Sequence, residues 1–148
     1  MSATGLQVFD ETLHKTNSWL KEIAEELGLD RQGAYQVLRA GLHCLRDRLT
    51  INEAADLGDQ LPMLVRGIYY EASHPAGKPE KIRSRDEFLA RVSARIQMKQ
   101  PVDSERAAGA VFRTLENHIS LGEVRHVIQS LPEEIRTLWP HPREGAVR

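Results

Sequence analysis

The chain has 148 residues, of which 41% are hydrophobic and 28% are charged. This composition is typical of a globular protein and excludes an intrinsically disordered chain. The 20 basic and 21 acidic residues nearly cancel, so the molecule as a whole does not attract nucleic acid or an anionic membrane.

We expect a single domain over residues 1–148, because a chain of this length buries about 70% of the surface that its unfolded form exposes. No apolar run approaches the roughly 18 residues that a membrane-spanning helix needs. The N-terminal sequence MSATGLQVFD also lacks the basic and then apolar layout of a secretion signal. One cysteine, Cys44, cannot form an internal disulfide and fits a reducing compartment, so a cytoplasmic location is expected.

The first half of the chain reads as four helices. Apolar residues recur at helical spacing from residue 9 to residue 27, and Gly28 follows where a left-handed C-terminal cap is expected. Asp30 is the N-cap of a second helix, whose apolar stripe leaves Arg46 and Asp47 off it. Thr50 with Glu53 forms a capping box that starts a short third helix. The Leu61-Pro62 step ends this helix and begins a fourth.

The second half repeats this order of elements. Residues 72–84, ASHPAGKPEKIRS, concentrate proline, glycine and charge and are predicted to be an exposed linker. Ser84 with Glu87 and Ser120 with Glu123 form further capping boxes, and Asp103 caps the helix between them. A last short helix begins at the Leu131-Pro132 step and ends near Trp139.

An offset of 70 residues aligns the two halves. Six identities fall within 27 positions, where roughly one or two would arise from average composition. Ala40, Leu45, Glu53, Leu61, Pro62 and Arg66 match Ala110, Leu115, Glu123, Leu131, Pro132 and Arg136. We therefore predict an all-α domain of about eight helices built from two four-helix pseudo-repeats, residues 9–71 and 85–139, that pack face to face. Residues 140–148 are predicted to be a flexible tail.

Four segments carry a resemblance to a known family. WLKEIAEELG, AYQVLRAGLHCLRDRLT, EAADLGDQLPMLVRGIYYE and the second-copy stretch SLPEEIRTLW resemble the bacterial family called domain of unknown function 2267. The resemblance covers nearly the whole chain. It implies a bacterial protein with an all-helical, orthogonal, globin-like arrangement, no established activity, and no catalytic or cofactor residues to carry over.

Catalytic and cofactor chemistry find little support in the residues. A nucleophile needs a neighbouring base and an orienting group, and no motif supplies such a set. Cys44 sits among apolar helix positions and is interpreted as a small buried hydrophobe. The six histidines are scattered, so no metal site is predicted, and neither His43 nor His118 has a partner that would mark a haem site. We therefore predict no enzyme activity and no cofactor.

The segment EAADLGDQLPML has the small-residue spacing of a DNA-binding helix-turn-helix, with Ala54 and Gly58 at the helix crossing. The helix that would enter the groove, PMLVRGIYY, is strongly apolar and poorly suited to bases and phosphates. DNA binding is therefore the disfavoured hypothesis, and no nucleic-acid partner is predicted.

The candidate binding residues lie at the ends of the two short helices. Arg66 and Arg136 occupy the same place in both copies, where a cation can satisfy terminal carbonyls or bind an anion. Tyr69, Tyr70 and Glu71 combine apolar and hydrogen-bonding character and are typical of interfaces. We predict a non-catalytic protein-interaction module, with homodimerisation through the apolar helix as one form of it. The alternative is a small-ligand or cofactor protein whose pocket lies between the repeats.

Overall fold

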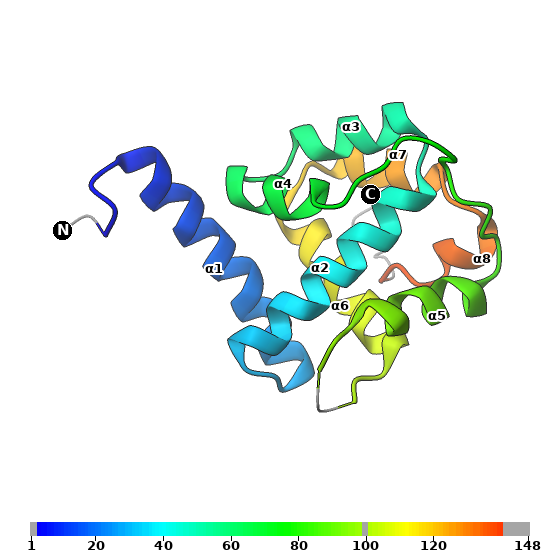
Figure 1. Cartoon of the computed structure of the whole chain (residues 1–148), viewed down its shortest axis with the longest axis horizontal. Coiled ribbons are helices and arrows are strands. Elements are labelled where there is room, and N and C mark those ends of the chain that lie inside the picture. The colour runs from blue at the N-terminus through cyan, green and yellow to red at the C-terminus, as the bar shows by residue number, and fades with distance from the viewer. Residues whose placement is uncertain (1–2, 99–100, 141–148) are drawn as a thin grey trace.

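The chain's computed structural model describes residues 3–98 and 101–140, and within these residues it contains eight α-helices and no strand (Figure 1). The all-α prediction is therefore confirmed. The helices are α1 (Gln7–Leu27), α2 (Arg31–Arg48), α3 (Ile51–Asp59), α4 (Met63–Tyr70), α5 (Arg85–Arg95), α6 (Ser104–His118), α7 (Leu121–Gln129) and α8 (Glu133–Arg136).

Most helix ends form where the local sequence predicts them. Gly28 adopts φ 68° after α1, a left-handed conformation that glycine tolerates. The Asp30 carboxylate accepts a 2.8 Å hydrogen bond from the amide of Gly33. The capping boxes of α3 and α5 are both complete.

The third capping box is only half formed. The Ser120 hydroxyl accepts a hydrogen bond from the amide of Glu123 at 3.1 Å, but the Ser120 amide donates to Gln60 Oε1 at 3.3 Å. Among the described residues, Glu123 Oε2 is buried without a hydrogen-bond partner. Burial raises the pKa of this carboxyl group. The prediction of a reciprocal box was wrong here because α3 supplies a competing acceptor from outside the local sequence.

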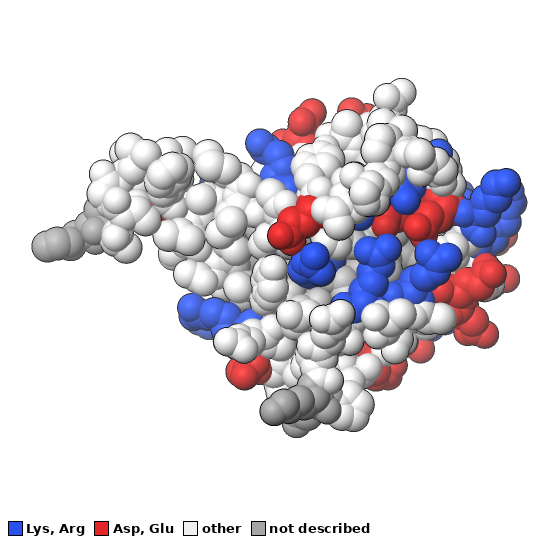
Figure 2. Space-filling model, viewed as in Figure 1, with Lys and Arg blue, Asp and Glu red and all other residues white. Residues whose placement is uncertain are grey.

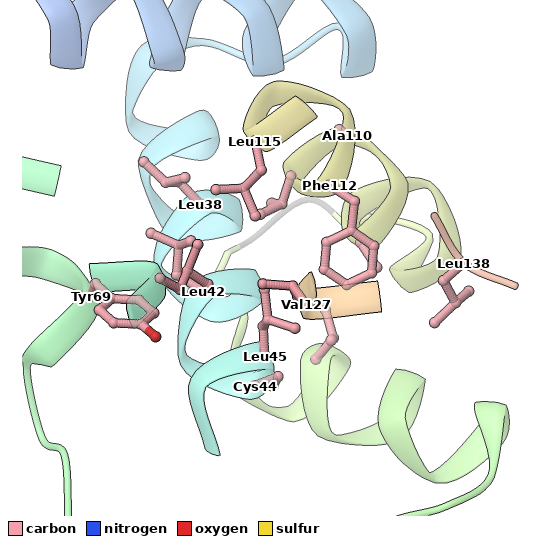
Figure 3. Packing of buried hydrophobic residues seen from close by; sticks show 14 of the residues in the cluster. Leu38, Leu42, Cys44, Leu45, Tyr69, Ala110, Phe112, Leu115, Val127 and Leu138 are labelled. Carbon is pink, nitrogen blue, oxygen red and sulfur yellow. The ribbon is translucent and has the colours of Figure 1, made fainter. Parts of the chain in front are cut away.

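The helices α2 and α6 cross at the centre of the molecule. At Gly41 a Cβ atom would lie 2.7 Å from Val111 Cγ2, so only the absence of a side chain allows this approach. Both α1 and α5 pack against α2 and α6. Figure 3 shows the resulting core, in which leucines of α2 face Phe112 and Leu115 of α6.

One half of α1 projects from the rest of the molecule (Figure 1). Trp19 and Ile23 in its C-terminal half are buried. Leu6, Phe9 and Leu13, around its N-terminal half, are 49%, 47% and 37% exposed. The apolar stripe of α1 is thus covered along only part of its length.

The segment 72–84 differs from the exposed linker that its composition predicts. Ile82 belongs to the core and is 6% exposed. The Glu80 amide donates to the carbonyl of Asp47 at 2.8 Å, and Arg48 Nε donates to the carbonyl of Ile82 at 2.6 Å. Hydrogen bonds therefore hold the second half of this segment against the end of α2. The predicted tail 140–148 lies, apart from Pro140, outside the described residues.

In the part of the chain that the structure describes, none of the helices has the length and hydropathy needed to traverse a lipid bilayer.

Candidate functional site

A cluster of buried polar side chains lies in the C-terminal half of α2. His43, Arg46 and Asp47 are 1%, 4% and 3% exposed. The prediction that Arg46 and Asp47 lie off the buried face was wrong, because chain from α4, α5 and the 72–84 segment covers this side of α2.

The guanidinium of Arg46 is held by one carboxylate and two backbone carbonyls. Its Nε donates to Asp47 Oδ1 at 2.8 Å, and its Nη1 donates to the carbonyls of Tyr69 at 2.6 Å and Glu71 at 2.8 Å. Burying a charge is costly unless hydrogen bonds and an opposite charge compensate it. These contacts compensate Arg46 and bind the end of α4 to α2.

Asp47 also lies close to two further cations. Arg95 Nη2 lies 3.1 Å from Asp47 Oδ2, and Lys78 Nζ lies 4.0 Å from Asp47 Oδ1. Lys78 is also 3.6 Å from Glu80 Oε2, and Arg91 pairs with Glu80 at 2.7 Å. Figure 2 shows Lys and Arg side chains gathered between α2 and α5, with acidic side chains beside them.

A small cavity of about 140 Å³ borders this cluster. Its polar lining comes from Arg46, Asp47, Tyr70, Ser73, His74 and Lys78, beside Pro75. Its apolar lining comes from α3 and the residue before its cap. These apolar residues are Leu49, Ile51, Ala54 and Ala55.

Three of the predicted site residues meet at this cluster. Tyr69 is buried, its hydroxyl donates to the carbonyl of Ala54 at 2.7 Å, and burial raises the pKa of its phenol. Tyr70 is 39% exposed and stands edge-on to the Tyr69 ring. The Glu71 carboxylate pairs with Arg39 at 2.9 Å. Tyr69 therefore packs in the core, whereas Tyr70 and Glu71 remain accessible.

The other two predicted residues, Arg66 in α4 and Arg136 in α8, share one equivalent contact, to the carbonyls of Leu61 and Leu131. Arg66 donates to the carbonyls of Gly58 and Leu61, both at 2.9 Å. Arg136 donates to the carbonyl of Leu131 at 2.8 Å and to that of Gln129 at 3.1 Å. Each guanidinium thus satisfies carbonyls at the end of the preceding helix.

Two reactive groups in α2 are withdrawn from solvent. Burial raises the pKa of the Cys44 thiol to about 12, which keeps it protonated and agrees with its interpretation as a small hydrophobe. His43 Nε2 lies 2.7 Å from the carbonyl of Ile68, and burial lowers the pKa of its imidazole. Within the described ranges, no group of three or more His, Cys, Asp or Glu side chains is arranged to hold a metal ion.

A second surface lies where α1 meets the start of α4. Leu64 donates its amide to the hydroxyl of Thr12 at 2.8 Å, which joins the two helices. Met63 and Leu64 are 48% and 39% exposed, while Val65 on the other side of α4 is buried. The α1–α4 surface consists of the exposed side chains Leu6, Phe9, Leu13, Met63 and Leu64.

A groove of about 400 Å³ borders the α1–α4 surface. Its walls come from α1 and α4, and α2 contributes Tyr35. Most of its lining side chains are apolar or small. They are Leu13, Thr16, Asn17, Leu20, Tyr35, Leu64, Gly67, Ile68 and Glu71.

Sequence reasoning missed Arg46, Asp47, Lys78 and Arg95. For Arg46 a signal exists, since it lies four residues after Leu42 and three before Leu49 and therefore shares their helix face. Asp47, Lys78 and Arg95 carry no local signal, because tertiary packing alone brings these three segments together.

Comparison with known proteins identifies one family. Residues 16–138 match the model of a family described as "Uncharacterized conserved protein (DUF2267)". No curated protein matches the chain. The projecting part of α1 precedes the matched region.

Proposed function

The chain belongs to the DUF2267 family, whose description names no activity, and we propose that this member is a non-catalytic interaction module that associates with a second copy of itself through the α1–α4 surface. A bacterial, cytoplasmic location is part of this proposal.

The observation that carries the proposal is the uncovered half of α1. Isolated exposed apolar residues are ordinary, but a contiguous group of them marks an interaction surface. Leu6, Phe9 and Leu13 continue the stripe whose other half is buried, and Met63 and Leu64 adjoin it. In Figure 2 the projecting part of α1 carries no charged side chain on the face shown.

A second copy fits this surface because it offers both a projection and a recess. Phe9 is an exposed aromatic side chain one turn before Leu13, and Leu13 lines the groove. In a two-fold dimer each copy presents the same patch to the other, so antiparallel α1 helices can insert each Phe9 into the partner's groove. A buried aromatic anchor in an apolar recess is the usual centre of a stable interface.

We also propose the two-repeat architecture, with α1–α4 related to α5–α8 by a pseudo-two-fold axis. Gly41 and Val111, which meet where α2 crosses α6, are separated by 70 residues, the same offset as the sequence identities. The paired roles of Arg66 and Arg136 support this relation. So does the packing of both α1 and α5 against α2 and α6. The orthogonal, globin-like arrangement stays a prediction.

In this proposed relation, the projecting part of α1 has no counterpart in α5. Helix α1 has 21 residues, whereas α5, its counterpart, has 11. At 1.5 Å per residue the extra length is about 15 Å. The added turns lie outside the shared core and carry Phe9 and Leu13 of the α1–α4 surface, which supports a role in association.

Light scattering coupled to size-exclusion chromatography at two concentrations tests the dimer. We expect a dimer mass for the native chain and a monomer mass for Phe9→Ser. Val8→Ser is the matched control, because Val8 is also exposed, at 44%, but points about 100° away from Phe9 around the helix. A monomeric native chain, or equal dissociation by both variants, would contradict the proposal.

A small-ligand function is the second candidate, favoured by the cavity beside Arg46. The geometry favours the cavity over Arg66 and Arg136 as the ligand's place, since these two guanidinium groups bind backbone carbonyls at helix ends and neither lines the cavity. The chemistry of the cavity is argued below.

A further inference from the structure

We propose that the cavity at the end of α2 binds a small aliphatic carboxylate, with Lys78 and Arg46 holding the carboxylate and apolar side chains of the α3 region covering its short chain. This site is separate from the α1–α4 surface and does not depend on dimerisation.

The charge balance of the cluster favours an anion. The ion pairs that extend from the cavity join four cations, Arg46, Lys78, Arg91 and Arg95, to the carboxylates of Asp47 and Glu80. Of these residues Arg46, Asp47 and Lys78 line the cavity itself. The described cluster thus has an excess of two positive charges. Because this region is partly withdrawn from water, an anion is attracted there more strongly than at the open surface.

Lys78 and Arg46 also have N–H groups that form no hydrogen bond with the described residues. Lys78 Nζ is 4.0 Å from Asp47 Oδ1 and 3.6 Å from Glu80 Oε2, both longer than a hydrogen bond, although its side chain is only 16% exposed. Arg46 uses Nε and Nη1 in its hydrogen bonds, and among the described residues none is formed by Nη2. An ammonium and a guanidinium nitrogen with unused protons are suited to the two oxygens of a carboxylate.

The volume of the cavity and its apolar wall define the part of the ligand that follows the carboxylate. At about 140 Å³ the cavity is below the roughly 300–1,000 Å³ of sites for larger ligands. Leu49 is 1% exposed and Ala54 is 8% exposed, so the inner wall is buried hydrocarbon. Inorganic phosphate would satisfy the charge but leave this wall uncovered. A carboxylate with two to four carbons has both parts, and butyrate has the longest apolar chain of these.

Isothermal titration calorimetry with sodium butyrate tests the site. We expect saturable binding with a Kd on the order of 1 mM, which is reasonable for so few ligand atoms. Lys78→Gln should weaken binding about tenfold or more, because it removes a charged donor. Lys81→Gln is the matched control, an equal change of charge at an exposed residue of the same segment, and should leave the Kd unchanged.

A cavity-filling variant separates binding in the cavity from general attraction to the cationic face. Ala55 is exposed on α3 and lines the cavity, so Ala55→Leu extends into it without entering the core. We expect this variant to lose butyrate binding with little change in Tm, while Ala90→Leu, at an exposed position of α5, binds normally.

Several outcomes would overturn the proposal. These are no saturable butyrate binding, equal weakening by Lys78→Gln and Lys81→Gln, phosphate binding as tightly as butyrate, or full binding by Ala55→Leu. Phe9→Ser should bind butyrate like the native chain, so failure of the dimer and failure of this site are distinguishable.

Discussion

Asp47 stabilises the packing at the end of α2, because it is the carboxylate partner of three cations. Replacing it with alanine leaves Arg46 buried without its counter-charge. Removing one partner of a buried pair typically costs about 3–5 kcal/mol. We predict a loss of this size for Asp47→Ala, measured as the free energy of unfolding in urea.

The Arg39–Glu71 pair provides the comparison for Asp47. Its side chains are 34% and 49% exposed, and exposed pairs contribute about 1 kcal/mol or less. Glu71→Ala, which keeps the carbonyl that Arg46 uses, should therefore change stability little. Equal losses for Asp47→Ala and Glu71→Ala would show that burial is not what makes Asp47 important.

His43 is predicted to make stability depend on pH. Burial lowers its pKa below the ordinary value of 6.5, so between the two pKa values the unfolded chain binds the proton more readily than the folded chain. The free energy of unfolding should therefore fall as pH decreases below about 6.5. Urea unfolding across this range should show a weaker slope for His43→Gln than for the native chain. An unchanged slope would exclude His43 as the source.

The close crossing of α2 and α6 predicts that alanine has opposite effects on stability at two glycines of these helices. Alanine is a better helix former than glycine by about 1 kcal/mol, yet at position 41 its Cβ would overlap Val111. We predict that Gly41→Ala destabilises the protein by about 1–3 kcal/mol, as overpacking does. Gly109→Ala in α6 is the control, because its Cβ would meet no atom within 4 Å, and it should stabilise. Thermal unfolding of both variants checks the opposite signs.

The helices themselves could be predicted because their signals are local. Gly28, Asp30 and Thr50 specify helix ends through contacts within a few residues. Ile82 could not be placed in the core from sequence, because it stands among prolines and charges and is buried through contacts with α2, far away in the chain. Local chemistry predicts elements, whereas the packing of an irregular segment depends on the finished fold.

The candidate site was only partly predictable for the same reason. The carbonyl-binding role considered for Arg66 and Arg136 rests on their place near a helix end, which sequence can reveal. The cluster around Asp47 joins residues from α2, α5 and the connecting segment. Charged residues are normally exposed, so nothing in the sequence distinguishes Asp47 from an ordinary surface carboxylate.

At the scale of the whole molecule, the shared core predicts cooperative unfolding. Helices α1 and α2 pack against α6, and α5 packs against α2, so neither half covers its own apolar face. We predict a single thermal transition in which the calorimetric and van't Hoff enthalpies agree. Scanning calorimetry of Phe9→Ser avoids a contribution from dimer dissociation. Two separate transitions would indicate halves that fold independently.

The position of Cys44 gives the protein an internal reporter of its own opening. The chain has one thiol, which is 6% exposed and is covered by the core residues around it. A chromogenic disulfide reagent can react with it only after that covering has moved away. The rate of colour development in native buffer therefore reports how often the structure around Cys44 opens. No dye or tag has to be attached to the molecule.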